Sequence, residues 1–135
     1  MYKCVWLIKF RPELDPEDVR RAWRTSHGAL ALQVPGIRRY IQNHWIQPST
    51  GSEMTYDGSV DCWFDNREAF EKAWVSPEWK TLIEDDVRLF DRERVPAFEG
   101  AAVNEHIMRW ESLPEGRIYT SAGTIPPPAS SPDGS

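Results

Sequence analysis

The spacing of apolar residues changes several times along the chain, and each spacing predicts a different element. Several runs are rich in Val, Ile, Trp, Tyr and Phe, and alternate residues in them share one face, which predicts β-strands. In one of these runs Tyr40, Gln42 and His44 fall on the same face. The predicted strands cover residues 3–10, 37–46, 58–64 and 101–108.

A helical spacing of apolar residues follows the first strand. We expect Asp15 to cap this helix, with Pro16 at its first position, because both residue types are favoured there. The helix should continue to about residue 32, and Pro35-Gly36 should end it.

One histidine lies on the apolar stripe of this predicted helix. His27 shares the stripe with Val19, Trp23 and Leu30, so its ring should point towards the core side. Imidazole is the side chain best suited to move protons near neutral pH. A bonded core histidine is the plainer interpretation of His27, and a proton-transfer residue is the functional one.

Two more helices are predicted after the third strand. Asn66 should cap a short one, and Ser76-Pro77 should begin a longer one. Asp85-Asp86 is interpreted as a solvated face of the longer helix. The residues expected to face inward are Phe70, Trp74, Trp79, Leu82, Ile83 and Phe90.

The resulting order, β-α-β-β-α-β, predicts an α+β ferredoxin-like fold with a four-stranded antiparallel sheet and helices on one face. Strand residues on both faces are apolar, as with Trp6 against Val5 and Leu7. An apolar sheet face without helices must be covered, so we expect a homodimer that closes through the sheets.

Length and charge narrow the functional classes. The chain has 135 residues and a net charge of −5, without a basic stripe, which argues against nucleic acid and anionic membranes as partners. No apolar run is long enough for a membrane span. Two cysteines without metal-binding spacing predict a reduced, cytoplasmic protein, and three scattered histidines give no support for a metal site.

The C-terminal part differs in composition from the rest. Pro, Gly and Ser dominate from about residue 113, so this part should not order independently by burying apolar surface. We therefore expect a domain over residues 1–112 and a tail over residues 113–135.

The ordered set of motifs over about residues 2–108 resembles the EthD family of dimeric α+β barrel proteins, especially members of the methylmuconolactone methylisomerase type. The stretches that carry the resemblance are Arg11-Pro12, Val19-Arg20 to His27, Pro35-Gly36, Tyr40, Cys62-Trp63-Phe64, Asp86 to Phe90 and Val103-Asn104-Glu105.

The resemblance implies a cofactor-free enzyme whose active site lies between the helices and the sheet. His27, Tyr40 and Cys62 match the family's helix His, strand Tyr and strand Cys. Isomerase-like members have a second His before the third strand, where this chain has none, and His44 is the nearest substitute.

We therefore expect a lyase, isomerase or cyclase acting on a small hydrophobic carbonyl, lactone or polyketide-like substrate. His27 would transfer protons, and Tyr40, with His44, would polarise the carbonyl. A non-catalytic binding module and a cofactor-free monooxygenase remain open alternatives. The residues expected to line the substrate cavity are Trp23, Cys62, Phe64 and Trp79.

Overall fold

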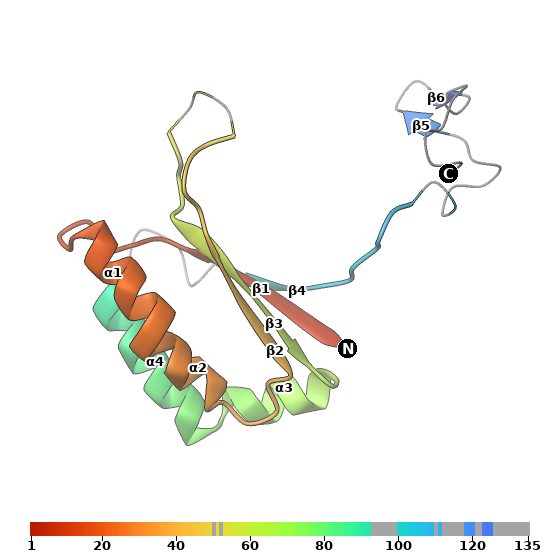
Figure 1. The fold of residues 1–135 in the computed structure, drawn as a ribbon. Helices are drawn as coiled ribbons and strands as arrows, with labels where there is room; N and C mark the ends of the chain where they lie inside the picture. Colours follow the sequence, from red (N-terminus) through yellow and green to blue (C-terminus); the bar gives the residue numbers. More distant parts are fainter. Residues whose placement is uncertain are drawn as a thin grey trace. The chain divides into compact units, whose positions relative to one another are not determined.

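The computed structural model describes residues 1–49, 51, 53–92, 100–109, 111, 118–120 and 123–125. Its first unit alternates between strands and helices (Figure 1). The elements are β1 (Tyr2–Ile8), α1 (Pro16–Ala22), the π-helix η1 (Trp23–His27), α2 (Gly28–Leu32), β2 (Arg39–His44), β3 (Gly58–Phe64), α3 (Arg67–Trp74), α4 (Pro77–Leu89) and β4 (Gly100–Val103).

The four strands form one antiparallel sheet in the order β2-β3-β1-β4, and the helices lie on one of its faces (Figure 1). This arrangement confirms the predicted α+β, ferredoxin-like fold. The register pairs Tyr40 with Cys62 and Cys62 with Cys4, so these three residues form one row across the sheet. Because alternate residues share a face, this row lies on the same side as the buried Val60 and Phe64.

The helix predicted from Asp15 to about residue 32 has a π-helical middle. The Gly28 N–H reaches the Trp23 carbonyl five residues earlier, and regular α-helix resumes after it. Asp15 occupies the N-cap position, but its side chain makes no capping hydrogen bond, contrary to our expectation. Asn66 and Ser76 do cap their helices, accepting from Ala69 N and Trp79 N.

The last strand is shorter than predicted. It spans Gly100–Val103 rather than residues 101–108. The described residues group into two compact units, Met1–Val103 and Asn104–Ser135, whereas the sequence placed the boundary after residue 112. The second unit contains a small hairpin of β5 (Ile118–Thr120) and β6 (Gly123–Ile125), an element that the Pro- and Ser-rich composition did not predict.

The core of the first unit consists of two apolar clusters. One is built around Phe10, Trp23 and Phe90, and the other around Phe64 and Trp79. Two partly buried residues pack against both clusters, Trp6 and Tyr40. These two side chains therefore stand where the two clusters meet.

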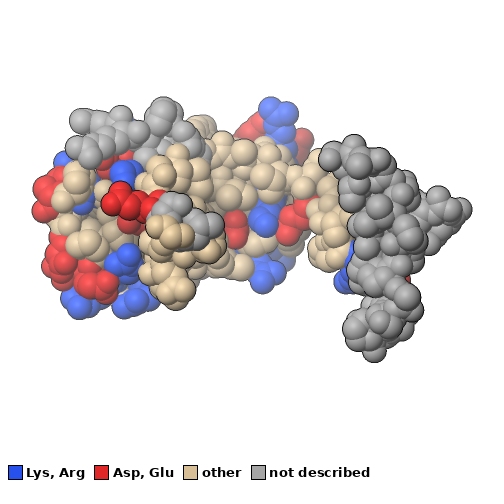
Figure 2. Space-filling model, turned by 90° about the horizontal axis from the view of Figure 1, so that it is seen from above, with Lys and Arg blue, Asp and Glu red and all other residues tan. Residues whose placement is uncertain are grey.

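Charged residues lie on the outer surface of the helical layer. Figure 2 shows acidic and basic side chains next to one another on the side of the first unit where these helices lie. On α1, Arg20 and Arg21 pair with Glu17 and Asp18 at 2.8 and 3.4 Å. Among the described residues, no helix is both long and apolar enough to cross a membrane.

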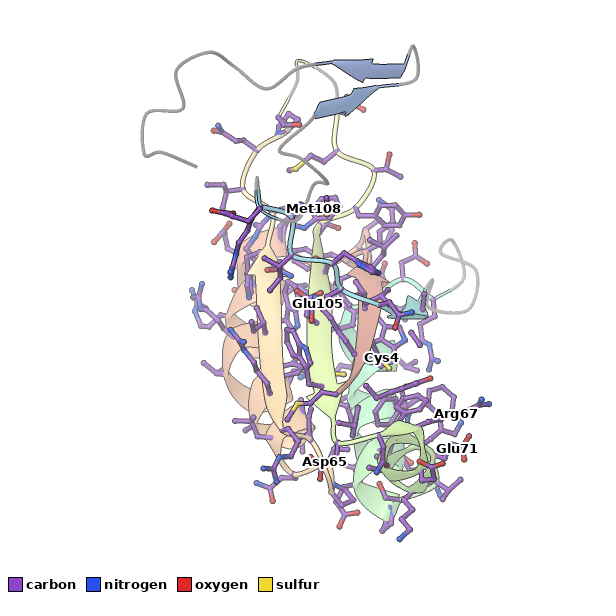
Figure 3. The ribbon with its side chains drawn as sticks, turned by 90° about the vertical axis from the view of Figure 1, so that its right-hand side faces the viewer. Cys4, Asp65, Arg67, Glu71, Glu105 and Met108 are labelled. Atoms are coloured by element: carbon purple, nitrogen blue, oxygen red, sulfur yellow. The ribbon has the colours of Figure 1, made fainter. Side chains whose placement is uncertain are left out.

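No helix of the described residues lies over the other face of the sheet (Figures 1 and 3). It combines apolar and polar groups, because Asn43 donates to the Asp61 carboxylate at 3.0 Å. The Trp63 ring lies between two cations, with Lys3 at 4.8 Å and Arg39 at 5.0 Å from its centroid. The apolar residues of this face are Val5, Leu7, Ile41, Ala101 and Val103.

A glycine at the start of β3 allows the Trp23 ring to lie against the sheet. A Cβ at Gly58 would overlap the Asn43 carbonyl and come within 2.6 Å of the Trp23 ring. We predict that Gly58→Ala destabilises the fold by about 1–3 kcal/mol, as overpacking typically does. Thermal unfolding measures this effect. Gly51→Ala is the control, since no atom of the described residues lies within 4 Å of its Cβ, and an equal loss in both variants would contradict the prediction.

Candidate active site

A cavity of about 590 Å³ lies between the helices and the sheet. Most of its wall is apolar, and its polar groups come from few residues. The sheet contributes Trp6, Tyr40 and Cys62, and α4 contributes Trp79, Ile83 and Asp86. His27 reaches the same cavity from η1, and Lys80, Glu84 and Arg92 add charged groups. An apolar pocket with a few convergent polar groups is typical of small-molecule sites.

His27 lies between two neighbouring carboxylates of α4. Its Nδ1 is 2.7 Å from Asp85 Oδ2, and its Nε2 is 3.0 Å from Asp86 Oδ1. The His27 side chain is only 5% exposed, and those of Asp85 and Asp86 are 15% and 12% exposed. Both ring nitrogens are therefore engaged by acceptors, which is the environment of a protonated imidazole.

The two carboxylates change the acid–base properties of the imidazole. Burial alone lowers the pKa of His27, but hydrogen bonds and charge attraction from Asp86 and Asp85 outweigh it, so the net shift is upward. Burial raises the pKa of Asp86, and His27 opposes this only in part. Asp85 differs, because Arg88 and His27 outweigh its burial and lower its pKa.

Asp85-Asp86 is thus not a solvated helix face, and that interpretation of the sequence was wrong. Asp86 is 8% exposed and lies on the inner side of α4. The signal was in the sequence, because Asp86 follows Leu82 and Ile83 by four and three residues and therefore continues their stripe. A carboxylate on an apolar stripe, with a histidine predicted on the facing helix, indicates a buried pair.

Tyr40 lies in the cavity wall, and its hydroxyl is part of a hydrogen-bond network. Gln42 Nε2 donates to the Tyr40 oxygen at 3.1 Å. Burial raises the pKa of Tyr40 to about 12, although Gln42 and the Trp23 side chain act in the opposite direction. The phenol therefore stays protonated at neutral pH and is available as a hydrogen-bond donor.

His44 does not reach the cavity. It packs against the Trp23 ring, with centroids 4.0 Å apart and ring planes tilted by 34°, and its Nε2 bonds to Gln42 Oε1 at 2.8 Å. Burial, together with Arg24 and Arg20, lowers its pKa. His44 shares a face with Tyr40 as expected, but it is connected to Tyr40 through Gln42 and not through a shared cavity.

The residues expected to contact substrate divide into two groups. Cys62 and Trp79 line the cavity, whereas Trp23 and Phe64 are both 0% exposed and lie in the core behind it. Trp74, expected to face inward, is 53% exposed and lies at the cavity, where α3 ends.

Cys62 faces a second thiol across the sheet. Contact with Cys4 and burial both raise the pKa of Cys62, so this sulfur is a poor nucleophile at neutral pH. Both cysteines are free and buried. Within the described part of the chain, no group of three His, Cys, Asp or Glu side chains has an arrangement that holds a metal ion.

Three polar residues to which the sequence analysis gave no role in the site are part of the site or its support. They are Asp86, Gln42 and Arg92. Burial lowers the pKa of Arg92, and Asp86 partly opposes this shift. Gln42 was recognisable only by sharing a strand face with Tyr40, and Arg92 had no signal, because it follows the end of α4.

Comparison with protein-family models identifies the family of this chain. The EthD domain model matches residues 11–93. The chain belongs to the EthD family. The matched region contains His27, Tyr40 and the Asp85-Asp86 pair, and it therefore spans the polar groups of the cavity described above.

Solved structures resemble this EthD chain at low sequence identity. An EthD family protein from Bacillus halodurans is 16% identical, with a TM-score of 0.61 over 78% of this chain and 100% of the other. A dimeric protein of ferredoxin-like fold from Bacteroides fragilis is 18% identical, with a TM-score of 0.54 over 76% and 91%. These likenesses confirm the fold.

A third solved structure is that of an enzyme. SnoaB, a cofactor-independent oxygenase from Streptomyces nogalater, is 11% identical, with a TM-score of 0.51 over 78% of this chain and 95% of the other. No curated protein sequence matches the chain significantly. The EthD domain match establishes the family, whereas the reaction must be argued from the site.

The buried cluster should make stability depend on pH. Because the pKa of His27 is raised above 6.5 in the folded state, its stabilising contribution is complete below about pH 6.5 and is lost as the pH rises through the folded value. The pKa of Asp85 is lowered in the folded state, so its contribution to stability is present above about pH 3.8 and is lost as the pH falls through the folded pKa.

We therefore predict that the melting temperature decreases between pH 6 and pH 9 and that His27→Gln abolishes this part of the decrease. Melting curves recorded across this range measure it. His106→Gln, at an exposed histidine, should keep the wild-type slope. A wild-type slope in His27→Gln would show that the cluster does not hold a proton.

Proposed function

We propose that this EthD protein is a cofactor-independent enzyme that moves a proton on a small hydrophobic carbonyl compound. The observation that carries the proposal is the position of His27 and Asp86 in the wall of an apolar cavity, with Tyr40 in the same wall. Removal of a proton beside a carbonyl needs a base, a donor for the developing oxyanion and exclusion of water. The side chains of this cavity would supply the base and the donor, and its apolar wall would exclude water.

The base is the His27–Asp86 pair rather than His27 alone. Both ring nitrogens of His27 face carboxylates, so the imidazolium has no free lone pair for a substrate. Asp86 keeps a second oxygen, and its raised pKa makes it a stronger base than an ordinary carboxylate. We assign proton removal to Asp86, with His27 as the cation that keeps Asp86 ionised.

Asp85 has a supporting role. Its Oδ2 faces His27 Nδ1, while its Oδ1 accepts from Arg88 at 2.9 Å. Arg88 holds Asp85 ionised, and Asp85 in turn fixes the ring orientation and stabilises the imidazolium. Tyr40 would donate to the carbonyl oxygen, where negative charge develops as the C–H bond breaks. Trp6 and Trp79 would pack against the hydrophobic body of the substrate.

Hydrogen exchange tests this chemistry without knowledge of the product. Cyclic ketones, lactones and aryl ketones are incubated in D₂O, and deuterium at the carbon beside the carbonyl is measured by mass spectrometry. We predict enzyme-dependent exchange for at least one class. Asp86→Asn should slow it by about 10²- to 10⁴-fold, the usual contribution of a general base. Tyr40→Phe should slow it by about 10²- to 10³-fold.

Two control variants make the result specific. Glu78→Gln makes the corresponding acid-to-amide change at an exposed carboxylate of α4 that does not line the cavity, and it should keep wild-type exchange. Asp85→Asn should lose less than Asp86→Asn, because Asp85 acts through His27. Equal activity of Asp86→Asn and wild type would refute the assignment. If no class exchanges while hydrophobic ligands bind wild type and Asp86→Asn equally, a binding module is the better description.

An oxygenase is the second candidate, because the structural neighbour SnoaB is a cofactor-independent oxygenase of this fold. An oxygen electrode separates the two reactions. Proton transfer followed by isomerisation, elimination or ring closure consumes no O₂, whereas oxygenation consumes it in proportion to product.

We also propose that the protein forms a homodimer through the sheet face that has no helices. This face exposes Val5, Leu7 and Ile41 in part, and Val103 is 36% exposed. Solved proteins of similar fold from Bacteroides fragilis and Thermobifida fusca are described as dimeric. Trp63, between Lys3 and Arg39, would add a large flat surface to the contact.

Light scattering tests the dimer. We predict a dimer at micromolar concentration and a monomer after Leu7→Glu, because a charge buried without a partner opposes association. Leu32→Glu, on α2, places the same charge at a residue that is already 64% exposed and should leave the dimer intact. A wild-type monomer at these concentrations, or a dimer in both variants, would contradict this interface.

A further inference from the structure

A chain of hydrogen bonds lies behind the Tyr40 side of the cavity. Gln42 is at its centre. The Nε2 of Gln42 donates to the Trp23 carbonyl at 2.7 Å and to the Tyr40 oxygen at 3.1 Å. The Oε1 of Gln42 is 2.8 Å from His44 Nε2. All these contacts are partly buried, so the surrounding structure holds their geometry.

The direction of each bond follows from the chemistry of its partners. The Trp23 carbonyl can only accept, so the NH₂ group of Gln42 must face it and the Gln42 oxygen must face His44. His44 must then carry its hydrogen on Nε2. The second N–H of Gln42 faces the Tyr40 oxygen, which accepts it. The hydroxyl hydrogen of Tyr40 therefore cannot point towards Gln42.

The surroundings of His44 agree with this assignment of donors and acceptors. Its Nδ1 is buried and has no hydrogen-bond partner among the described residues. A hydrogen on that nitrogen would lack an acceptor, and a positive ring would lie near Arg20 and Arg24. The neutral form with the hydrogen on Nε2 is thus the one that the surroundings favour.

The backbone of η1 holds the Gln42 amide in place. The π-helical turn leaves the Trp23 carbonyl accepting from Gly28 N–H and from Gln42. A Cβ at Gly28 would be 3.2 Å from Gln42 Nε2 and 3.3 Å from the Trp23 carbonyl, closer than side chains normally approach. A glycine at this position thus lets the amide come close to the helix backbone.

We propose that Gln42 is the positioning residue that turns the Tyr40 hydroxyl hydrogen into the cavity, with His44 fixing the orientation of the Gln42 amide. This inference rests on the proposed function, because a Tyr40 hydroxyl that points into the cavity would donate to the carbonyl of a bound substrate. It also gives His44 a place in the site without contact with the substrate.

The first test uses acetophenone as an aryl ketone probe and measures its carbonyl stretch by infrared spectroscopy. A hydrogen bond lowers this frequency, so we expect a lower band on the wild type than on Tyr40→Phe. In Gln42→Glu the carboxylate accepts the Tyr40 hydrogen, and the band should move to its position on Tyr40→Phe. Gln33→Leu, at an exposed glutamine, is the control and should match wild type.

Two further variants separate positioning from general disruption. Gln42→Leu removes the Gln42 donor and leaves only the Trp23 side chain beside the Tyr40 oxygen, so the band should lie between those of wild type and Gln42→Glu. Gly28→Ala keeps every polar side chain and displaces the Gln42 amide by a few tenths of an ångström. It should therefore shift the carbonyl band in the same direction as Gln42→Leu, but by a smaller amount. A wild-type band equal to that on Tyr40→Phe, or unchanged by Gln42→Glu, would overturn the proposal.

The second test needs no bound ligand. Nitrogen NMR of labelled histidine should show His44 at pH 7 as neutral with hydrogen on Nε2, and Gln42→Leu should abolish this preference. A hydrogen on Nδ1 in the wild type would overturn the proposed order of bonds. Failure of hydrogen exchange with all carbonyl compounds, combined with the expected infrared and NMR results, would instead refute the catalytic role and leave the positioning of Tyr40 standing.

Discussion

The bridge between His27 and the two carboxylates of α4 is the contact on which the arrangement of the cavity depends. It joins η1, from the first half of the chain, to α4 through charged groups that are nearly removed from water. Breaking a buried pair by removing one partner typically costs about 3–5 kcal/mol, because the remaining charge is left uncompensated. The bridge therefore fixes the separation of the two helices and also places a titratable group against the cavity.

The register of the sheet determines what faces this bridge. Pairing of β2, β3 and β1 brings Tyr40, Cys62 and Cys4 into one row on the helix side. A shift by one residue in β2 would turn Tyr40 and Gln42 to the opposite face and bring Ile41 into their place. The apolar alternation that selects the register thereby also selects which polar groups reach the cavity and its supporting network.

Much of this fold was predictable because its signals are local. Alternating residues identified the strands, and Asn66 and Ser76 marked helix starts that the structure confirms. His27 was predicted on an inner stripe and is buried. Asp86 was missed because two adjacent acids suggested a solvated surface, although its spacing from Ile83 placed it inside. Gln42 and Arg92 depend on contacts between distant segments, which no local pattern reveals.

Nuclear magnetic resonance of His27 tests the central claim most directly, because it reports where the proton lies in the bridge. At pH 6 both ring nitrogens should carry hydrogen and donate to Asp85 and Asp86, and substitution of Asp86 by Asn should lower the pH at which the ring loses its proton. If the ring were neutral at pH 6, with Nε2 unprotonated and facing Asp86, His27 would not be the cation that bridges Asp85 and Asp86, and the account would be contradicted.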